Sequence, residues 1–267
     1  MPFEIQAHRG ARAFYPENTI QAFCKAAELG CRVIELDLVV SHDRRIVVSH
    51  DPWIPDPAGT GSPQRYLYSL SFEEISLFDC GMISPDFPAQ KRISAFRPLL
   101  SEVFRAVEAG LCRIGRPGEM IYNLEVKSWE GKDGLAHPSP EDYASLVLQD
   151  ISESGIADRI RLQSFDSRIL IAAKRMQPEL CYGLLVEERS VFDSFPLRPG
   201  FVPEYVNPSL SIVDSELIAS MHELGSKVVV WTVNRREEMI RMRKIGADGI
   251  ITDHPEVALH MHELKGE

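Results

Sequence analysis

The chain has 267 residues, 44% of them hydrophobic, which is enough to bury the core of one large domain or two small ones. A formal net charge of −10 without a dense basic patch argues against nucleic acid as a partner. No apolar run approaches the roughly 20 residues that span a bilayer, and the first residues lack the features of a signal peptide. We therefore expect a cytoplasmic protein with no stable membrane anchor. The five cysteines, which form no Cys-x-x-Cys pair, indicate reduced thiols.

Strand-like and helix-like segments alternate along the chain, beginning with a strand over residues 3–7, a helix over 19–29 and a strand over 33–40 that 45–49 extends. The later segments, in order, are a helix at 99–109, strand 120–126, helix 141–154, strand 160–163, helix 167–176, strand 180–185, a weak helix near 188–195, strand 205–207, helix 215–224, strand 227–232, helix 236–245, strand 249–252 and helix 255–263. About eight strand–helix units of this length predict an α/β fold, a closed (β/α)₈ TIM barrel. An open doubly wound sheet is the alternative, although the G-x-G-x-x-G fingerprint is absent.

The connection between the second strand and its helix, residues 51–98, is far longer than usual for such a link. It contains a short helix predicted over 72–78, with Ser71 and Glu74 in the positions of a capping box. Long insertions at the C-terminal face of a barrel commonly cover the active site. We therefore expect residues 1–267 to form a single catalytic domain with 51–98 as an insertion over that face. A purely structural addition is the alternative.

Two carboxylates interrupt the apolar second strand. Alternation places Glu35 and Asp37 on one face of that strand and its apolar neighbours on the other. The same rule turns Glu125 and Lys127 of the next strand inward. Because buried like charges are costly unless a cation or hydrogen bonds compensate them, three such acids at one rim indicate a metal site.

The donor set of this site is made of carboxylate oxygens alone, from Glu35, Asp37 and Glu125. Oxygen ligands favour one hard divalent cation, Mg²⁺ or Ca²⁺. Zinc suits the set less well, because no histidine or cysteine cluster accompanies the acids. The alternative is an ion-pair network of the acids with Arg9 and Lys127 and no metal.

Two histidines lie at strand ends beside the acids. His8 ends the first strand and His50 ends the extension of the second, positions that favour an acid/base pair over two ordinary hydrogen-bonded histidines. Arg9 and Lys127 are candidates for binding an anion. Asp51 either orients His50 or caps a turn. We interpret the remaining histidines as surface residues: His42, His137, His222, His254, His260 and His262.

A set of ordered motifs resembles the signature of the glycerophosphodiester phosphodiesterase family over nearly the whole chain. The motifs are His8-Arg9-Gly10, Pro16-Glu17-Asn18-Thr19, Glu35-x-Asp37, His50-Asp51, Asn123-x-Glu125-x-Lys127, Ser164-Phe165-Asp166, Trp231-Thr232-Val233-Asn234 and the run from Gly246 to Asp253. One segment, residues 52–61, departs from the Arg-Thr-Thr-like stretch that many relatives carry. As a set in this order, the motifs are highly specific.

The resemblance implies a barrel with an insertion after its second strand, and it implies a role for each candidate residue. It makes Glu35, Asp37 and Glu125 metal ligands, and His8 and His50 the acid/base pair. It also makes Arg9 and Lys127 phosphate-binding residues, with Phe165 and Trp231 lining the alcohol side of the pocket.

The function implied is metal-dependent hydrolysis of a small-molecule glycerophosphodiester to sn-glycerol 3-phosphate and an alcohol, with His50 as acid and His8 as base. Three alternatives stay open at this point. The first is a phosphodiesterase that acts like a lysophospholipase D, and the second is a non-catalytic barrel that binds phosphodiesters. The third is an unrelated barrel enzyme that holds a sugar phosphate at residues 232–234 and 252–254.

Overall fold

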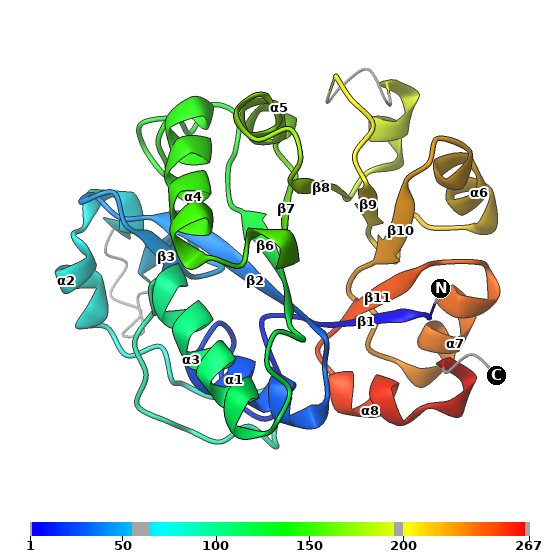
Figure 1. The fold of residues 1–267 in the computed structure, drawn as a ribbon, viewed down its shortest axis with the longest axis horizontal. Coiled ribbons are helices and arrows are strands. Elements are labelled where there is room, and N and C mark those ends of the chain that lie inside the picture. The colour runs from blue at the N-terminus through cyan, green and yellow to red at the C-terminus, as the bar shows by residue number, and fades with distance from the viewer. Residues whose placement is uncertain (1, 55–64, 195–199, 265–267) are drawn as a thin grey trace.

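The fold is a closed barrel of eight parallel strands (Figure 1), seen in a computed structural model that describes residues 2–54, 65–194 and 200–264. The first strand, β1, pairs with both its sequence neighbour β2 and the last strand, β11, which closes the sheet. The predicted TIM barrel is therefore confirmed, and the open sheet is excluded. Around the barrel the strands are β1 (Glu4–Ala7), β2 (Val33–Val40), β6 (Ile121–Val126), β7 (Ile160–Ser164), β8 (Cys181–Val186), β9 (Tyr205–Pro208), β10 (Lys227–Val230) and β11 (Gly249–Thr252).

Helices follow the strands and surround them (Figure 1). They are α1 (Ile20–Leu29), α3 (Leu100–Arg113), α4 (Pro140–Ser154), α5 (Ser167–Met176), α6 (Ser215–Glu223), α7 (Arg236–Lys244) and α8 (Pro255–His260), with short 3₁₀ helices η2 (Ala157–Arg159) and η4 (His262–Leu264). The weak helix predicted near residues 188–195 is instead a 3₁₀ helix, η3 (Arg189–Ser194), and its last predicted residue lies outside the described residues. No described helix is both long enough and apolar enough to cross a membrane.

The long connection after β2 begins with β3 (Ile46–Val48), which runs antiparallel to β2. Then come β4 (Trp53–Ile54), β5 (Arg65–Tyr66), η1 (Leu67–Ser69) and α2 (Phe72–Ser76), which lies at the left edge of Figure 1. The predicted capping box of α2 is present, because Ser71 and Glu74 each bind the other's backbone N–H. Residues 55–64, which include much of the departing 52–61 segment, lie outside the described residues.

The two faces of the barrel strands differ in polarity. On the outward face, apolar side chains such as Ile34, Leu36 and Leu38 pack under the helices in one continuous core. On the inward face a layer of amides fills the middle of the barrel. Asn123 donates to Gln6 at 2.8 Å and Asn207 donates to Gln163 at 2.6 Å.

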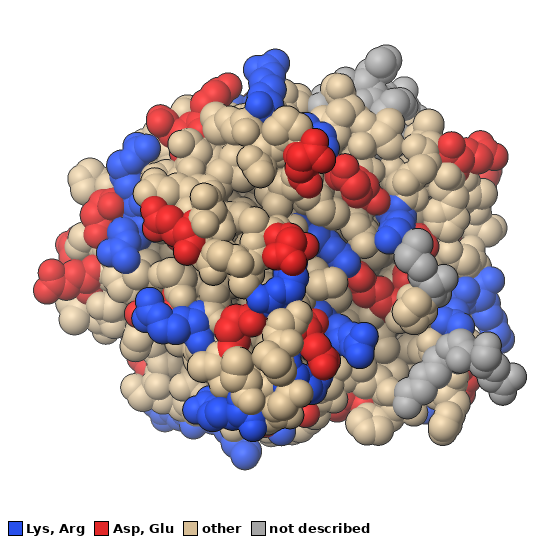
Figure 2. Space-filling model, viewed as in Figure 1, with Lys and Arg blue, Asp and Glu red and all other residues tan. Residues whose placement is uncertain are grey.

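Gly183 on β8 makes room for this amide layer, because a Cβ atom there would come within 3.2 Å of the Gln163 side chain. Below the amides, toward the N-terminal ends of the strands, Glu4 pairs with Arg161. On the outside, acidic and basic side chains are mixed across the visible face of the molecule, with no large patch of one sign (Figure 2).

Candidate active site

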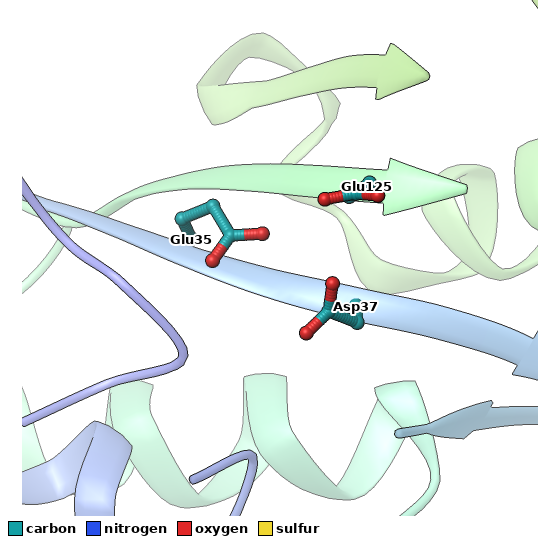
Figure 3. Close-up of side chains that lie close together, drawn as sticks. All are labelled: Glu35, Asp37 and Glu125. Atoms are coloured by element: carbon teal, nitrogen blue, oxygen red, sulfur yellow. The ribbon is translucent and has the colours of Figure 1, made fainter. Parts of the chain in front are cut away.

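The three predicted acids meet at the C-terminal end of the barrel, on the neighbouring strands β2 and β6 (Figure 3). The register of this parallel pair sets Glu35 beside Asn123 and Asp37 beside Glu125. One carboxylate oxygen from each acid lies within 4.8 Å of the others, and all three residues are buried. The alternation predicted from the sequence therefore brings the acids to one point.

Two cations lie against the acids. The Lys127 ammonium is 2.5 Å from Glu125 Oε1 and 2.9 Å from Asp37 Oδ1. Arg9 places its Nε 3.2 Å from Asp37 Oδ2 and its Nη1 2.9 Å from Glu17 Oε1. Because Asp37 lies between both cations, the pKa of its carboxyl is held well below the usual value although burial opposes this. Part of the cluster is thus an ion-pair network.

The network does not compensate the whole cluster. Arg9 and Lys127 carry two positive charges against the three carboxylates, and the Oε1 atom of Glu35 is buried without a hydrogen-bond partner in the described part of the chain. Burial and the neighbouring Asp37 and Glu125 raise the pKa of Glu35 well above its usual value. An orphaned carboxylate oxygen in an all-oxygen donor set is what a hard divalent cation needs as a ligand. The residues present therefore fit such an ion.

The backbone after β1 is shaped to reach the acids. Arg9 and Gly10 both have positive φ angles, of 53° and 85°, and the Arg9 N–H donates to Glu35 Oε2 at 3.0 Å. At Gly10 a Cβ atom would lie only 2.7 Å from the backbone of Ala22, so only glycine fits. A non-glycine residue such as Arg9 rarely adopts this conformation, and such exceptions cluster at functional sites.

Each of the two candidate histidines has a carboxylate on Nδ1. His8 Nδ1 is 2.6 Å from Asp253 Oδ1, and His50 Nδ1 is 2.9 Å from Asp51 Oδ1. The acceptor carboxylates favour a proton on Nδ1. In the neutral ring this leaves Nε2 without a proton and able to accept one. Burial lowers the pKa of His8 below the usual value, partly offset by its hydrogen bond to Asp253. Asp51 therefore contacts His50, as the orienting role requires.

A cavity of about 480 Å³ joins these groups at the mouth of the barrel. Every residue of the predicted site except Asp37 lines it, and Asp37 lies buried beneath. Phe165 and Trp231 form an apolar wall, with ring centroids 5.5 Å apart and planes at 89°. The Trp231 indole is fixed by a 2.7 Å hydrogen bond from Nε1 to the Asn207 carbonyl.

Sequence reasoning missed some residues of this site. Asp253, which binds His8, is held in turn by Asn234 at 2.7 Å. Asn18 donates to Asp37 at 2.8 Å from the loop before α1. Both belong to motifs quoted above for the resemblance, and that was the only signal that could have found them.

The prediction that His137 is a surface residue is wrong. His137 is buried, and its Nε2 accepts a hydrogen bond from the Trp129 N–H at 2.9 Å, behind the cavity wall. The segment around it has neither strand nor helix periodicity, so its burial could not be predicted; in the fold its ring lies beside Trp129 and Tyr143. His42, His222, His260 and His262 are exposed, as predicted, and His254 is half-buried.

Known proteins with similar sequences agree with the family resemblance of the motifs and with the barrel fold. Residues 8–257 match the model of the Glycerophosphoryl diester phosphodiesterase family. The chain is 32% identical to a glycerophosphodiester phosphodiesterase of Caldanaerobacter subterraneus subsp. tengcongensis, over 96% of both chains.

Two solved structures have the same fold. One, from Silicibacter pomeroyi DSS-3, has a name that assigns it provisionally to the glycerophosphoryl diester phosphodiesterases. It is 27% identical with a TM-score of 0.80, over 95% of this chain and 90% of that one. The other is an Oleispira antarctica phosphodiesterase in complex with the product sn-glycerol-3-phosphate, 22% identical with a TM-score of 0.77 over 96% and 95% of the two chains. Given the family match and the curated relative, the chain belongs to the Glycerophosphoryl diester phosphodiesterase family.

Proposed function

We propose that the protein hydrolyses glycerophosphodiesters to sn-glycerol 3-phosphate and an alcohol, with the help of one divalent cation, Mg²⁺ or Ca²⁺. The observation that carries this proposal is the cavity in which His8 and His50 face the same space as Glu35, Arg9 and Lys127. Family membership supports it independently. A barrel that only bound phosphodiesters would not need two carboxylate-bound histidines in that space.

Glu35, Asp37 and Glu125 would hold the cation. When bound, such an ion supplies Lewis-acid polarisation of a phosphoryl oxygen. Arg9 and Lys127 border the same space and would bind the remaining phosphate oxygens, where negative charge grows during the reaction. Phe165 and Trp231 would pack against carbon atoms of the substrate, excluding water from one side of the phosphate.

The histidines would move the protons. His8, with Nδ1 bound to Asp253, offers Nε2 as a base that takes the proton of the nucleophile, either water or a glycerol hydroxyl of the substrate. As the new P–O bond forms, the P–O bond to the alcohol breaks, and His50 in its protonated form donates a proton to the leaving oxygen. Where the glycerol hydroxyl attacks first, the cyclic phosphate is then opened by water with the same two groups.

The test is release of glycerol 3-phosphate from glycerophosphocholine, measured by a coupled assay with Mg²⁺, Ca²⁺ or EDTA present. We expect turnover with at least one cation and its loss in EDTA, while His50→Ala provides the inactive control. Lysophosphatidylcholine, assayed in parallel, distinguishes an enzyme of water-soluble diesters from one that acts like a lysophospholipase D. Failure to release glycerol 3-phosphate with any cation would contradict the proposal.

A further inference from the structure

A second cavity, of about 740 Å³, adjoins the active site, and His50 lines both cavities. Its floor includes Ser49 and Arg97, and the insertion supplies apolar side chains such as Phe78 and Met82. His50, the residue assigned above as the acid, therefore borders both spaces. No role in the reaction described so far requires it.

Arg97 is the unusual residue of this cavity. It is only 8% exposed, and its one hydrogen bond in the described residues runs from Nε to Ser49 Oγ at 3.1 Å. No carboxylate of the described residues lies within ion-pair distance of its guanidinium, which leaves the planar fork of N–H donors for another partner. A buried cation without an anion is costly, so Arg97 is suited to bind a negative group that the described residues do not supply.

A comparison with Arg9 supports this reading. Both arginines line a cavity beside His50, Arg97 buried and Arg9 partly buried, but Arg9 is surrounded by acids, and Asp37, Glu17 and Glu35 raise its pKa although burial opposes this. At Arg97 burial prevails and the pKa is lowered. The two residues therefore differ in whether the described residues supply the counter-charge.

The acids that line the second cavity are already bound elsewhere. Glu17 pairs with Arg9 at 2.9 Å and with Arg12 at 2.6 Å, and Asp51 binds His50. Asp79 accepts backbone N–H groups of Gly81 and Ala95. At the rim, Arg92 adds an exposed second cation with no ion pair to a described carboxylate. Among the described residues that line this cavity, the charge left without an ion-pair partner is therefore positive.

We propose that this cavity binds a carboxylate carried by the alcohol of the substrate, with Arg97 as its ligand. The inference rests on the proposed function: if His50 protonates the leaving oxygen, the alcohol begins at His50, which also lines the second cavity. A guanidinium can hold a carboxylate through two parallel hydrogen bonds. The enzyme would then prefer glycerophosphodiesters of acidic alcohols.

Glycerophosphoserine and glycerophosphoethanolamine test the proposal, because they differ by a single carboxylate. We expect wild-type enzyme to have the higher kcat/KM for glycerophosphoserine. In Arg97→Gln the ratio of the two kcat/KM values should fall by roughly 10- to 100-fold, the worth of a hydrogen-bonded charge pair. A merely structural role for Arg97 would lower both values equally and leave the ratio unchanged.

Two further variants make the result specific. Arg97→Lys keeps the positive charge but loses the planar arrangement of N–H donors, so the ratio of the two kcat/KM values should fall by a smaller factor. This variant also replaces Arg97→Gln if that protein does not fold. Arg92→Gln is the matched control at the exposed rim, where screening by water predicts a change in the ratio of less than about 3-fold.

An unchanged ratio in both Arg97 variants would overturn the inference and place the alcohol against the Phe165–Trp231 wall instead. Wild-type enzyme that hydrolyses neither substrate, with any cation, would overturn the proposed function itself. Wild-type enzyme that hydrolyses both at equal kcat/KM would overturn the inference alone.

Discussion

The two ends of the barrel both hold charged side chains on inward strand positions, yet their charges are arranged differently. At the N-terminal end, Arg161 donates to both carboxylate oxygens of Glu4, at 2.7 and 2.8 Å, and its guanidinium lies 4.3 Å from the centre of the Tyr205 ring. At the C-terminal end, Arg9 and Lys127 face three acids, and Glu35 Oε1 has no partner among the described residues. The Glu4–Arg161 pair is complete within the chain, whereas the acid cluster has more carboxylates than cations among the described residues.

The two ends of the barrel therefore differ in role: the N-terminal end contributes stability, and the C-terminal end carries the candidate site. In TIM barrels, an ion pair at the N-terminal end contributes to stability, whereas the loops at the C-terminal end carry the chemistry. In a complete ion pair the charges compensate each other, so no net charge is available to bind a ligand. A cluster with an excess of buried carboxylates costs free energy on its own, and the proposed binding of a divalent cation would offset that cost. Substitutions at the two ends should therefore have opposite consequences.

The largest effect is expected for Glu35→Gln. Losing this ligand should lower kcat/KM by about 10³-fold or more, because a bound cation contributes several kcal/mol to transition-state stabilisation. The free energy of unfolding in EDTA should stay the same or rise, since the change removes an uncompensated buried charge. Steady-state kinetics and thermal unfolding in EDTA measure the two quantities.

Measuring stability during a metal titration tests the same comparison between wild type and Glu35→Gln. Wild-type protein should gain about 2.7 kcal/mol of stability at a cation concentration of 100 times Kd, and Glu35→Gln should gain much less at that concentration. A clear loss of stability for Glu35→Gln in EDTA would favour the ion-pair network without metal over the metal site.

His50→Ala should lower kcat by about 10²- to 10⁴-fold, the usual contribution of a general acid. His50 is 37% exposed at its side chain, so truncation should change the free energy of unfolding little. Turnover close to that of wild type would remove His50 from the mechanism. Thermal unfolding of the variant provides the folding control.

Asp253→Asn should lower kcat by about 10-fold or more, because the imidazole loses the group that orients it. The hydrogen bond that His8 donates to Asp253 raises the pKa of His8, so its removal should lower that pKa further. Since a base works above its pKa, the acid limb of the kcat/KM profile should move to lower pH. If the acid limb of the profile does not move, a group other than His8 determines its position.

The same substitution has a consequence for stability. Although burial opposes it, the hydrogen bond to His8 and the charges of His8 and Arg12 hold the pKa of Asp253 well below its usual value. Asp253 therefore stabilises the fold above about pH 4 and loses this contribution as the pH falls toward its lowered pKa. In Asp253→Asn the free energy of unfolding should decline less steeply over that acidic range, as measured by urea unfolding at each pH.

The smallest effect on activity is expected for Glu4→Gln, at the complete end of the barrel. Arg161 would keep its place without its counter-charge, which should cost about 1–3 kcal/mol of stability, while kcat stays near the wild-type value. Urea unfolding and steady-state kinetics on the same preparation check both parts. A large loss of kcat in folded Glu4→Gln would break the division between the two ends.

Much of this molecule could be predicted because strand alternation is a local property. Period-two patterning marked Glu35, Asp37, Glu125 and Lys127 as inward residues, and the parallel register then brought them together. What escaped prediction depends on tertiary placement. The partner of His8 lies 245 residues away across the closure of the barrel, and no local pattern encodes that pairing.

The same reason explains the other misses. His137 lies in a loop between β6 and α4, so its burial follows from the path of that loop and not from periodicity. The sequence alone suggests no role for Arg97, because only the three-dimensional arrangement of Ser49 and the nearby acids shows that no described carboxylate pairs with it. The 3₁₀ helix at Arg189–Ser194 lies where the helical pattern was weakest.

Barrel closure has a further consequence for the timing of synthesis. His8 is made among the first residues of the chain, but Asp253 follows β11, the last strand to be translated and the one that pairs with β1. A growing polypeptide on the ribosome thus carries its imidazole long before the carboxylate that steers it exists. With the roles proposed for His8 and Asp253, full hydrolytic activity is therefore acquired only when the final strand docks.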